Sequence, residues 1–176
     1  MDKVKTYVLT VSRLFPTTHK RKAEPTYFPE KIITGRIMAG FLEQHFNRHG
    51  LNFEIYHSSK LHTIRSNYPL WEKRIKEVQE GKAVLSLRYW SGRPYSSKQV
   101  EFAVLDKDSG CGIQDLIFLN RNILDPIIAI NSDCLELDIN DLYENDGLSF
   151  NDFKEWFKKY DLSKPMAIIH FTSFRY

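Results

Sequence analysis

The sequence has few of the features that mark secreted or membrane proteins. Its 176 residues include only 2 cysteines, Cys111 and Cys134, which are too few for a disulfide framework. No apolar run is long enough to span a bilayer. The opening stretch, MDKVKTYVLTVSRLFP, lacks the unbroken apolar core and the small-residue cleavage site of a signal peptide. We therefore expect a cytoplasmic protein with no membrane partner.

Common motifs of cofactor and metal chemistry are also missing. The chain has no glycine-rich phosphate loop and no GxSxG elbow. His45 and His49 are four residues apart, a spacing that can hold a metal on a helix. However, no Glu follows His45 directly, and no third ligand is evident. The sequence therefore predicts neither a metal centre nor a bound cofactor.

The chain does have enough apolar residues to fold. The hydrophobic fraction is 42% and the aromatic fraction is 14%, values typical of a folded protein and not of a disordered one. Its length matches one ordinary domain, and no low-complexity linker divides it. We expect a single domain over residues 1–176 that buries a core without disulfides or metal.

Charge is distributed unevenly along the chain. Residues 1–98 hold 18 Lys and Arg against 8 Asp and Glu, whereas residues 99–176 hold 7 against 14. A basic half of this size indicates an anionic partner, and nucleic acid is the first choice. The alternative is that the two halves fold together and neutralise each other, because sequence charge does not show how charges cluster in space.

Local patterns predict both strands and helices, so the fold class is α+β. Alternating apolar residues indicate strands, while proline, glycine and capping residues mark the ends of helices. The predicted strands cover residues 5–12, 51–56, 83–90, 98–105, 127–130 and 166–171. The predicted helices open at Pro29, cover 36–50, run from Pro69 to Gly81, and begin at Ser149. Residues 106–126 have no assignment, and His170 is expected in the core.

Three stretches, in this order along the chain, resemble the ASCH domain family of PUA-like proteins. Residues 28–35 resemble the helix that ends at the family's glycine, and residues 60–65 (Lys-Leu-His-Thr-Ile-Arg) resemble its Lys-x-x-Thr-x-Arg strand. Residues 145–149 (Asn-Asp-Gly-Leu-Ser), with the helix and strand that follow to Phe171, resemble its closing turn and last barrel strand. The resemblance implies a small PUA-like β-barrel with flanking helices. It also implies that the ligand is RNA or a nucleotide.

The sequence departs from the family between the first two stretches. The family's glycine sits a residue or two before the Lys, but here residues 37–59 separate Gly35 from Lys60. This segment looks like an inserted helix plus a strand. It could cover the cleft, supply specificity, or form the contact of a homo-oligomer.

The stretch at residues 60–65 carries the first candidate site. On a strand, Thr63 and Arg65 would share one face, and two cations beside a hydroxyl form an anion site. Arg65 offers a planar fork to phosphate, and Lys60 offers a point charge. His62, inside the same motif, could touch a base or fill a polar rim. The alternative is an exposed strand with ordinary surface charges.

The resemblance also implies a possible activity. Some small ASCH enzymes are amidohydrolases of acylated cytidine nucleosides, and their catalytic Lys, Thr and Glu would correspond to Lys60, Thr63 and Asp146. Lys60 in its neutral form would take the proton of Thr63, which attacks the acyl carbon, and Asp146 would protonate the leaving amine. Asp is one methylene shorter than Glu, which favours binding over catalysis. RNA phosphodiesters are a further substrate class for a hydrolase.

A second candidate contact is the predicted hairpin over Arg88–Tyr95, which interleaves cations with aromatics. Aromatic side chains stack on unpaired bases, and Arg binds phosphate. We expect Arg88, Trp90, Arg93 and Tyr95 to contribute, unless the aromatic rings pack on the barrel. The basic loop at residues 20–22 could follow a phosphate backbone. Three hypotheses therefore stand: an RNA- or nucleotide-binding domain, a hydrolase, or a protein-interaction module that uses the 37–59 segment.

Overall fold

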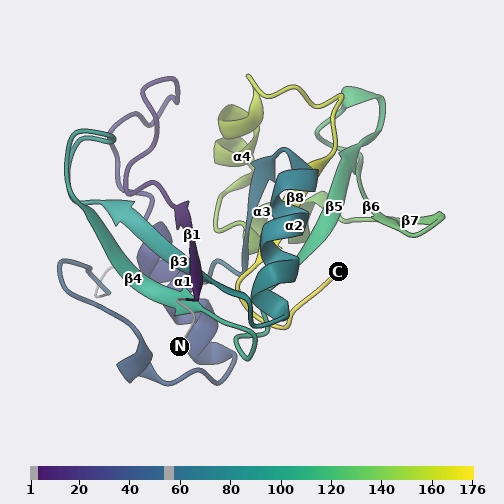
Figure 1. The fold of residues 1–176 in the computed structure, drawn as a ribbon. Helices are drawn as coiled ribbons and strands as arrows, with labels where there is room; N and C mark the ends of the chain where they lie inside the picture. Colours follow the sequence, from purple (N-terminus) through teal and green to yellow (C-terminus); the bar gives the residue numbers. More distant parts are fainter. Residues whose placement is uncertain (1–3, 54–57) are drawn as a thin grey trace.

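The computed structural model describes residues 4–53 and 58–176, which form two β-sheets and four α-helices (Figure 1). The strands are β1 (Lys5–Thr10), β2 (His62–Ser66), β3 (Ala83–Trp90), β4 (Gln99–Leu105), β5 (Gly112–Phe118), β6 (Pro126–Ile130), β7 (Asp133–Glu136) and β8 (Met166–His170). The helices are α1 (Phe28–Met38), α2 (Tyr68–Gln79), α3 (Ile139–Asn145) and α4 (Phe150–Phe157). The α+β class is confirmed. Over the described residues the strands form two separate sheets and no closed barrel.

The first sheet has the order β1-β3-β4. Strand β1 runs parallel to β3, and β3 runs antiparallel to β4 with a bulge between Leu87 and Arg88. The β3–β4 pair confirms the predicted hairpin. Leu9, Leu85 and Leu105 are almost fully buried and fix the inner face of this sheet.

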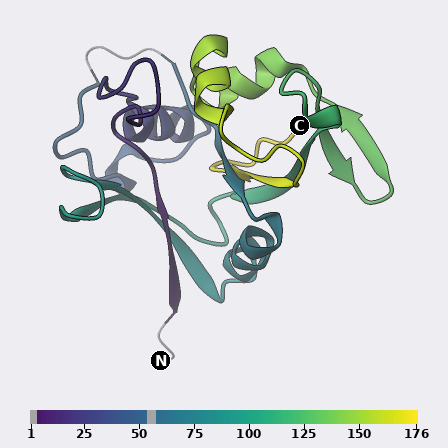
Figure 2. The same ribbon diagram turned by 90° about the horizontal axis from the view of Figure 1, so that it is seen from above.

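The second sheet has the order β2-β8-β5-β6-β7 and is antiparallel throughout. Strand β8 lies between β2 and β5, and all five of its residues are buried, including His170 as predicted. The β6–β7 hairpin projects from the body of the molecule (Figures 1 and 2). Helix α2 contacts β3 of the first sheet and both β5 and β8 of the second, so it joins the two sheets.

The helix start signals in the sequence are confirmed for α2 and α4. The Asn67 side chain accepts a hydrogen bond from Leu70 N, Pro69 lies in the first turn of α2, and Gly81 follows the helix with φ +72°. Ser149 Oγ accepts from Asp152 N at 3.2 Å and caps α4. Among the described residues there is no helix that is both long and apolar enough to cross a membrane.

The predicted helix over residues 36–50 is wrong. Helix α1 instead continues through Gly35 and ends at Met38, and only a single 3-10 turn (Glu43–His45) follows. Gly40, with φ +92°, interrupts the helical path, and Leu42 is exposed, so the apolar spacing at 37–42 does not form one buried stripe. Of the predicted strand at 51–56, residues 51–53 are not in a strand, and residues 54–56 lie outside the described residues.

Candidate functional site

The candidate site begins with an ion pair at the junction of three segments. Lys60, which precedes β2, donates through Nζ to Asp146 Oδ1 at 2.6 Å and to the Asp146 backbone oxygen. Both side chains are buried, with exposed fractions of 1% and 5%. The backbone holds them together, because Lys60 N donates to Lys31 O of α1 and Leu61 N donates to Asn145 O of α3.

Two glycines allow this close approach. A Cβ on Gly147, next to Asp146, would lie 3.1 Å from Lys60 Cβ and from Lys31 Cδ, and Gly147 has φ +72°. A Cβ on Gly35 would lie 3.2 Å from the backbone oxygen of Lys60. These are the glycines of the first and third stretches that resemble the ASCH family. Their physical role here is to let α1 and the turn after α3 pack against Lys60.

Burial shifts both members of the pair toward their neutral forms. It lowers the pKa of Lys60, and the nearby Arg65 lowers it further, whereas Asp146 acts to raise it. Burial likewise raises the pKa of Asp146, and the Lys60 cation opposes that rise. The ionic pair and the neutral pair contain the same number of protons, so a proton transfer along the 2.6 Å hydrogen bond interconverts them.

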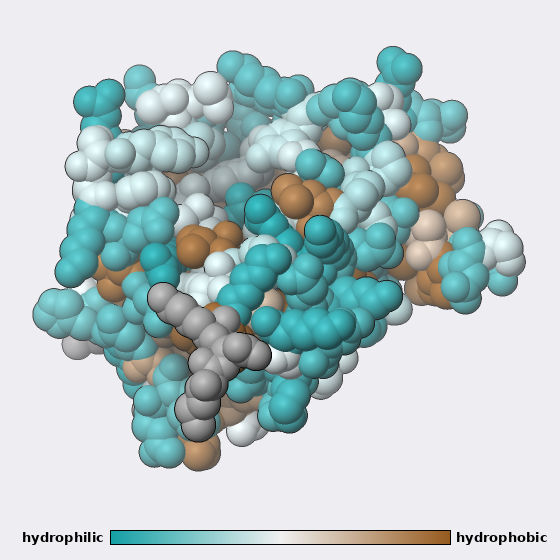
Figure 3. Space-filling view, viewed as in Figure 1, coloured by the Kyte–Doolittle hydropathy of each residue, from teal (hydrophilic) through white to brown (hydrophobic). Residues whose placement is uncertain are grey.

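A small cavity of about 20 Å³ brings four of the predicted site residues together. Lys60, Thr63, Arg65 and Asp146 all line it. Its apolar wall comes from the residue after β1, from α1, from β2 and from α4, namely Val11, Phe28, Ile64, Trp156 and Phe157. The volume is about that of one water-sized group. The face of the molecule in Figure 3 is hollowed in its upper half.

Arg65 closes the cavity from β2. Thr63 and Arg65 are two residues apart on β2 and therefore share a face. Arg65 Nη2 donates to the backbone oxygen of Thr10 at 2.6 Å, while its buried Nε has no hydrogen-bond partner among the residues that the structure describes. Burial lowers the Arg65 pKa, but a guanidinium stays charged in a protein. A buried guanidinium cation therefore lies at the wall of the cavity.

His62 lies beneath the pair and away from the surface. It is fully buried, its Nε2 is 2.8 Å from Tyr176 Oη, and its Nδ1 is 3.6 Å from Asp146 Oδ1. A ligand in the cavity would not reach His62 without displacing the residues around it. The structure thus places His62 behind Asp146, and not on the polar rim that one of the two sequence hypotheses proposed for it.

The hairpin residues divide into two groups. Arg88 is half-buried, donates to Ser86 Oγ at 2.7 Å and forms an ion pair with Glu101 at 3.5 Å. Trp90 is partly buried and packs against Tyr95, with ring centroids 5.5 Å apart. Tyr95 is 90% exposed, and Arg93 is also exposed. Neither Arg93 nor Tyr95 lines the cavity. Burial lowers the pKa of Arg65, and the phenols of Tyr160 and then Tyr95 act in the opposite direction.

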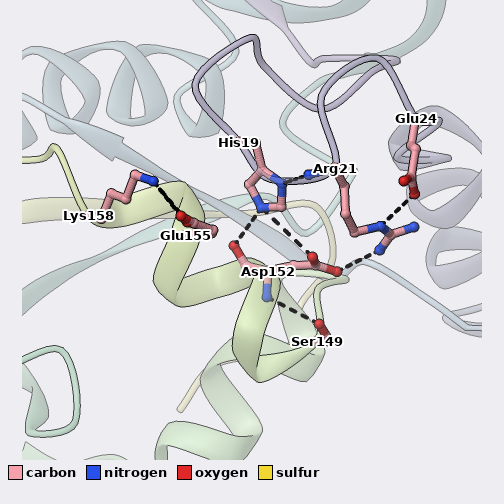
Figure 4. Close-up of polar contacts among 7 residues, drawn as sticks. All are labelled: His19, Arg21, Glu24, Ser149, Asp152, Glu155 and Lys158. Carbon is pink, nitrogen blue, oxygen red and sulfur yellow. Dashed lines mark hydrogen bonds and ion pairs between the residues drawn. The ribbon is translucent and has the colours of Figure 1, made fainter.

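The basic loop at residues 20–22 is held against α4 by an ion pair between Arg21 and Asp152 (Figure 4). Arg21 Nη1 donates to Asp152 Oδ2 and Arg21 Nε donates to Glu24 Oε2, both at 2.7 Å. His19 is buried, accepts from Arg21 N at Nδ1, and contacts the Asp152 backbone oxygen through Nε2. Arg21 is therefore neutralised by acidic partners, which weakens the hypothesis that this loop follows a phosphate backbone.

Sequence reasoning missed Lys31 and Tyr176. Lys31 Nζ donates to Gly147 O at 2.6 Å, and burial followed by the nearby Lys60 lowers its pKa to about 8. It also lines a wider hollow of about 670 Å³ together with Tyr27 and Asn145. The position of Lys31 inside the first ASCH-like stretch was the available signal. Tyr176 gave none, because its contact with His62 joins residues 114 positions apart.

The last observations concern metal binding and similarity to known proteins. Over the described residues, no three His, Cys, Asp or Glu side chains gather into a group that could hold a metal ion. Comparisons of the chain with protein-family models, with curated proteins and with solved structures give no match.

Proposed function

We propose that this protein binds RNA or a nucleotide at the cavity between β1, β2 and α4, with the β3–β4 turn as an outer contact. The observation that carries the proposal is the convergence of Lys60, Thr63, Arg65 and Asp146 on one cavity. These residues come from stretches that are 80 residues apart in the sequence. We further propose that the two sheets are an opened relative of the PUA-like barrel, because the three ASCH-like stretches meet around Lys60.

In this proposal the inner and outer residues have different tasks. Lys60 already has an anionic partner, so the phosphate contact falls to Arg65 and the exposed Arg93. The exposed ring of Tyr95 offers a surface on which an unpaired base can stack. Because the cavity holds about one small group, only an exocyclic substituent of a base would reach Lys60 and Thr63.

The binding test uses a fluorescently labelled single-stranded RNA and the full chain. Tyr95→Ala should weaken the affinity by roughly 5- to 100-fold, since a base stacked on an aromatic ring contributes ~1–3 kcal/mol. Leu135→Ala is the control, because Leu135 is an exposed apolar residue on β7 and does not line the cavity. Equal affinities for wild type and Tyr95→Ala would remove the hairpin from the interface, and no binding to any RNA or nucleotide would end the proposal.

The buried Lys60–Asp146 pair favours a second candidate function, hydrolysis of an N-acylated nucleoside. In the first half-reaction Thr63 Oγ1 bonds to the acyl carbon, the amide C–N bond breaks, Lys60 takes the Thr63 proton, and Asp146 protonates the leaving amine. This step starts from the neutral pair and ends with the ionic pair. A water then hydrolyses the ester, returning a proton to Thr63 and releasing the carboxylic acid, so the reaction consumes one water.

The catalytic test compares two substitutions at Thr63. Thr63→Ser keeps a hydroxyl and should retain turnover of N-acylated cytidine, whereas Thr63→Val keeps the shape and should abolish it. Binding should survive in both variants. If the wild type turns over no acylated nucleoside across a broad pH range, this second function is excluded and the binding proposal stands alone. Full activity of Thr63→Val would exclude Thr63 as the nucleophile.

A further inference from the structure

His62 connects the Lys60–Asp146 pair to Tyr176. Its Nε2 atom is 2.8 Å from Tyr176 Oη, and its Nδ1 atom is 3.6 Å from Asp146 Oδ1. Nδ1 is buried and has no hydrogen-bond partner within the described part of the chain. The imidazole therefore lies between a phenol and the carboxylate that holds Lys60. The imidazole hydrogen can be on Nδ1 or on Nε2. Its position decides whether an N–H group or a nitrogen lone pair faces Asp146.

The hydroxyl of Tyr176 has three polar neighbours. Asn145 Nδ2 donates to it at 3.1 Å, the Asp141 backbone oxygen lies 3.1 Å away as an acceptor, and His62 Nε2 is the third neighbour. Burial raises the pKa of Tyr176, and burial followed by His170 and Lys60 lowers that of His62 well below its usual value. At neutral pH the phenol and the imidazole therefore keep one hydrogen each.

Two arrangements of these hydrogens are possible. If the phenol donates to His62 Nε2, the imidazole hydrogen is on Nδ1 and points toward Asp146, which stabilises an ionised carboxylate. If the phenol donates to the Asp141 oxygen, His62 Nε2–H donates to the phenol, and a bare Nδ1 faces Asp146. A bare nitrogen lone pair next to a carboxylate is repulsive, so this second arrangement suits a protonated carboxyl group and a neutral Lys60.

The distances favour the first arrangement. A hydroxyl donor is usually about 2.7–2.8 Å from its acceptor, which matches the His62 contact, while 3.1 Å to the Asp141 oxygen is long for a hydroxyl donor. The Tyr176 backbone is also fixed, because Tyr176 N donates to Gln114 Oε1 and Gln114 Nε2 donates to Tyr176 O. The phenol is thereby held in reach of His62.

We propose that His62 and Tyr176 are positioning residues that hold the Lys60–Asp146 pair in its ionic form, through the Nδ1–H tautomer of His62 that the Tyr176 hydroxyl selects. The neutral pair, which a Thr63 nucleophile requires, becomes available when the phenol turns to the Asp141 oxygen. The inference rests on the pair used in the proposed function but on no ligand. The other titratable groups that face His62 are Lys60 and His170, and neither hydrogen-bonds to the imidazole among the described contacts.

The test is nuclear magnetic resonance of the full chain with ¹⁵N-labelled histidine, which reports which ring nitrogen carries the hydrogen. Wild-type His62 should show a protonated Nδ1 and a bare Nε2. Tyr176→Phe removes the donor and Asp146→Asn removes the charge, so each should shift the ratio of the two tautomers toward Nε2–H. His170 is the internal control: it is buried beside His62, and its tautomer should not change in Asp146→Asn. In Tyr176→Phe, the ¹³C titration midpoint of the Asp146 carboxyl should rise by about half a pH unit.

The outcomes separate this inference from the proposed function. A wild-type His62 that carries its hydrogen on Nε2 overturns the proposal, and so does a ratio that neither variant moves. If the variants do not fold, the wild-type spectrum alone decides the tautomer. RNA binding and nucleoside turnover are measured on the same wild-type sample, so their failure would leave the tautomer result intact, and a failed tautomer result would leave the binding result intact.

Discussion

At the scale of single residues, the Lys60–Asp146 pair is the feature that most constrains chemistry. Buried charges are costly unless they are paired and hydrogen-bonded, and Lys60 meets this condition with two hydrogen bonds to one residue. The ammonium also lies 4.2 Å from the centroid of the Phe28 ring. A lysine held this way is a poor phosphate ligand, because a phosphate would have to displace Asp146.

The pair should therefore show strong energetic coupling. Asp146→Asn leaves the Lys60 cation without its counter-charge, and Lys60→Met leaves the Asp146 carboxylate alone, so each should lower the free energy of unfolding by about 3–5 kcal/mol. The double variant should lose clearly less than the sum of the two single losses. Urea denaturation of the four proteins measures the coupling. Losses that simply add would show that the pair does not act as a unit.

Lys31 predicts a dependence of stability on pH. Burial lowers its folded-state pKa to about 8 from the ordinary value of 10.5. Between these two values the unfolded chain binds more protons at Lys31 than the folded chain, so the Lys31 contribution to stability rises with pH. Below pH 8 its destabilising contribution is fully present, and above pH 10.5 it is absent.

The variant Lys31→Met measures this contribution. Relative to wild type, its gain in the free energy of unfolding should be largest near pH 7 and should shrink as the pH approaches 10.5. Lys82→Met is the control, because Lys82 is exposed and its pKa is raised by Glu80. A Lys31→Met gain that does not change with pH would contradict the lowered pKa.

The site residues differ in how far the sequence could predict them. The ASCH resemblance predicts a site at Lys60, Thr63, Arg65 and Asp146, and the structure gathers these residues around one cavity. What the sequence could not show was that Lys60 is neutralised, because the partner lies 86 residues away. Tyr176 was missed for the same reason. Local pattern indicates which residues can do chemistry, while long-range contacts determine their charge state.

At the scale of elements, the segment at residues 39–53 is part of the packing of the first sheet. Asn47 N donates to the backbone oxygen of Phe102, and Asn47 Nδ2 donates to that of Glu101, so Asn47 occupies the outer edge of β4. Phe46 is buried in the core, and Tyr89 Oη donates to His49 O. These contacts show that part of the 37–59 segment packs against the first sheet.

Removing the side-chain contacts of Asn47 should weaken the packing of this segment against the edge of β4. Asn47→Ala keeps the backbone bond from Asn47 N to Phe102 but loses two side-chain hydrogen bonds, from Nδ2 to the Glu101 oxygen and from His49 N to Oδ1. It should lower the free energy of unfolding by about 1–2 kcal/mol. Exposed strand edges also promote association, so the variant should form larger species at high protein concentration. Gln44→Ala, at an exposed neighbouring position, is the control. Thermal unfolding and light scattering give the two readouts, and an Asn47→Ala variant as stable as Gln44→Ala would show that the edge contacts do not matter.

Elements whose ends are marked by proline, glycine, a capping residue or turn residues were predicted well. Pro69, Gly81 and Ser149 marked helix ends correctly, and the turn residues between β3 and β4 marked the hairpin. Strand β5 was missed because the half-buried Asp115 in its middle interrupts the apolar alternation. Helix α3 was missed because it has only 7 residues, which is too short for a clear helical periodicity. The parallel pairing of β1 with β3 had no local signal.

At the scale of the whole molecule, the two oppositely charged halves partly neutralise each other. Arg21 pairs with Asp152, Lys60 with Asp146, and Arg88 with Glu101, and each pair joins the basic half to the acidic half. The alternative that the halves compensate in the fold is therefore supported for these cations. Exposed cations such as Arg93 remain accessible to an anionic partner.

This distribution predicts a moderate dependence of RNA affinity on salt. The slope of log K against log salt concentration for a single strand is about −0.7 for each phosphate that the protein neutralises. With Arg65 and Arg93 as the main contacts, we expect a slope of about −1 to −2. Arg93→Ala should reduce it by about 0.7, whereas Lys107→Ala, on the turn after β4, should leave it unchanged. An affinity that does not vary with salt would contradict phosphate contacts altogether.

The pairing of β2 with β8 determines when, during synthesis, the residues of the site can come together. Thr63 is opposite Ile169 and Arg65 is opposite Ala167, so among the described strands β2 has no neighbour until β8, about 100 residues further along the chain, has been made. Closing a loop of that length costs conformational entropy before any contact offsets it, and such non-local pairing folds slowly. A ribosome-bound chain could complete the first sheet by Leu105, yet Asp146 and β8 would not have emerged. The protein should therefore become competent for its ligand only after β8 has emerged, in one late and cooperative step.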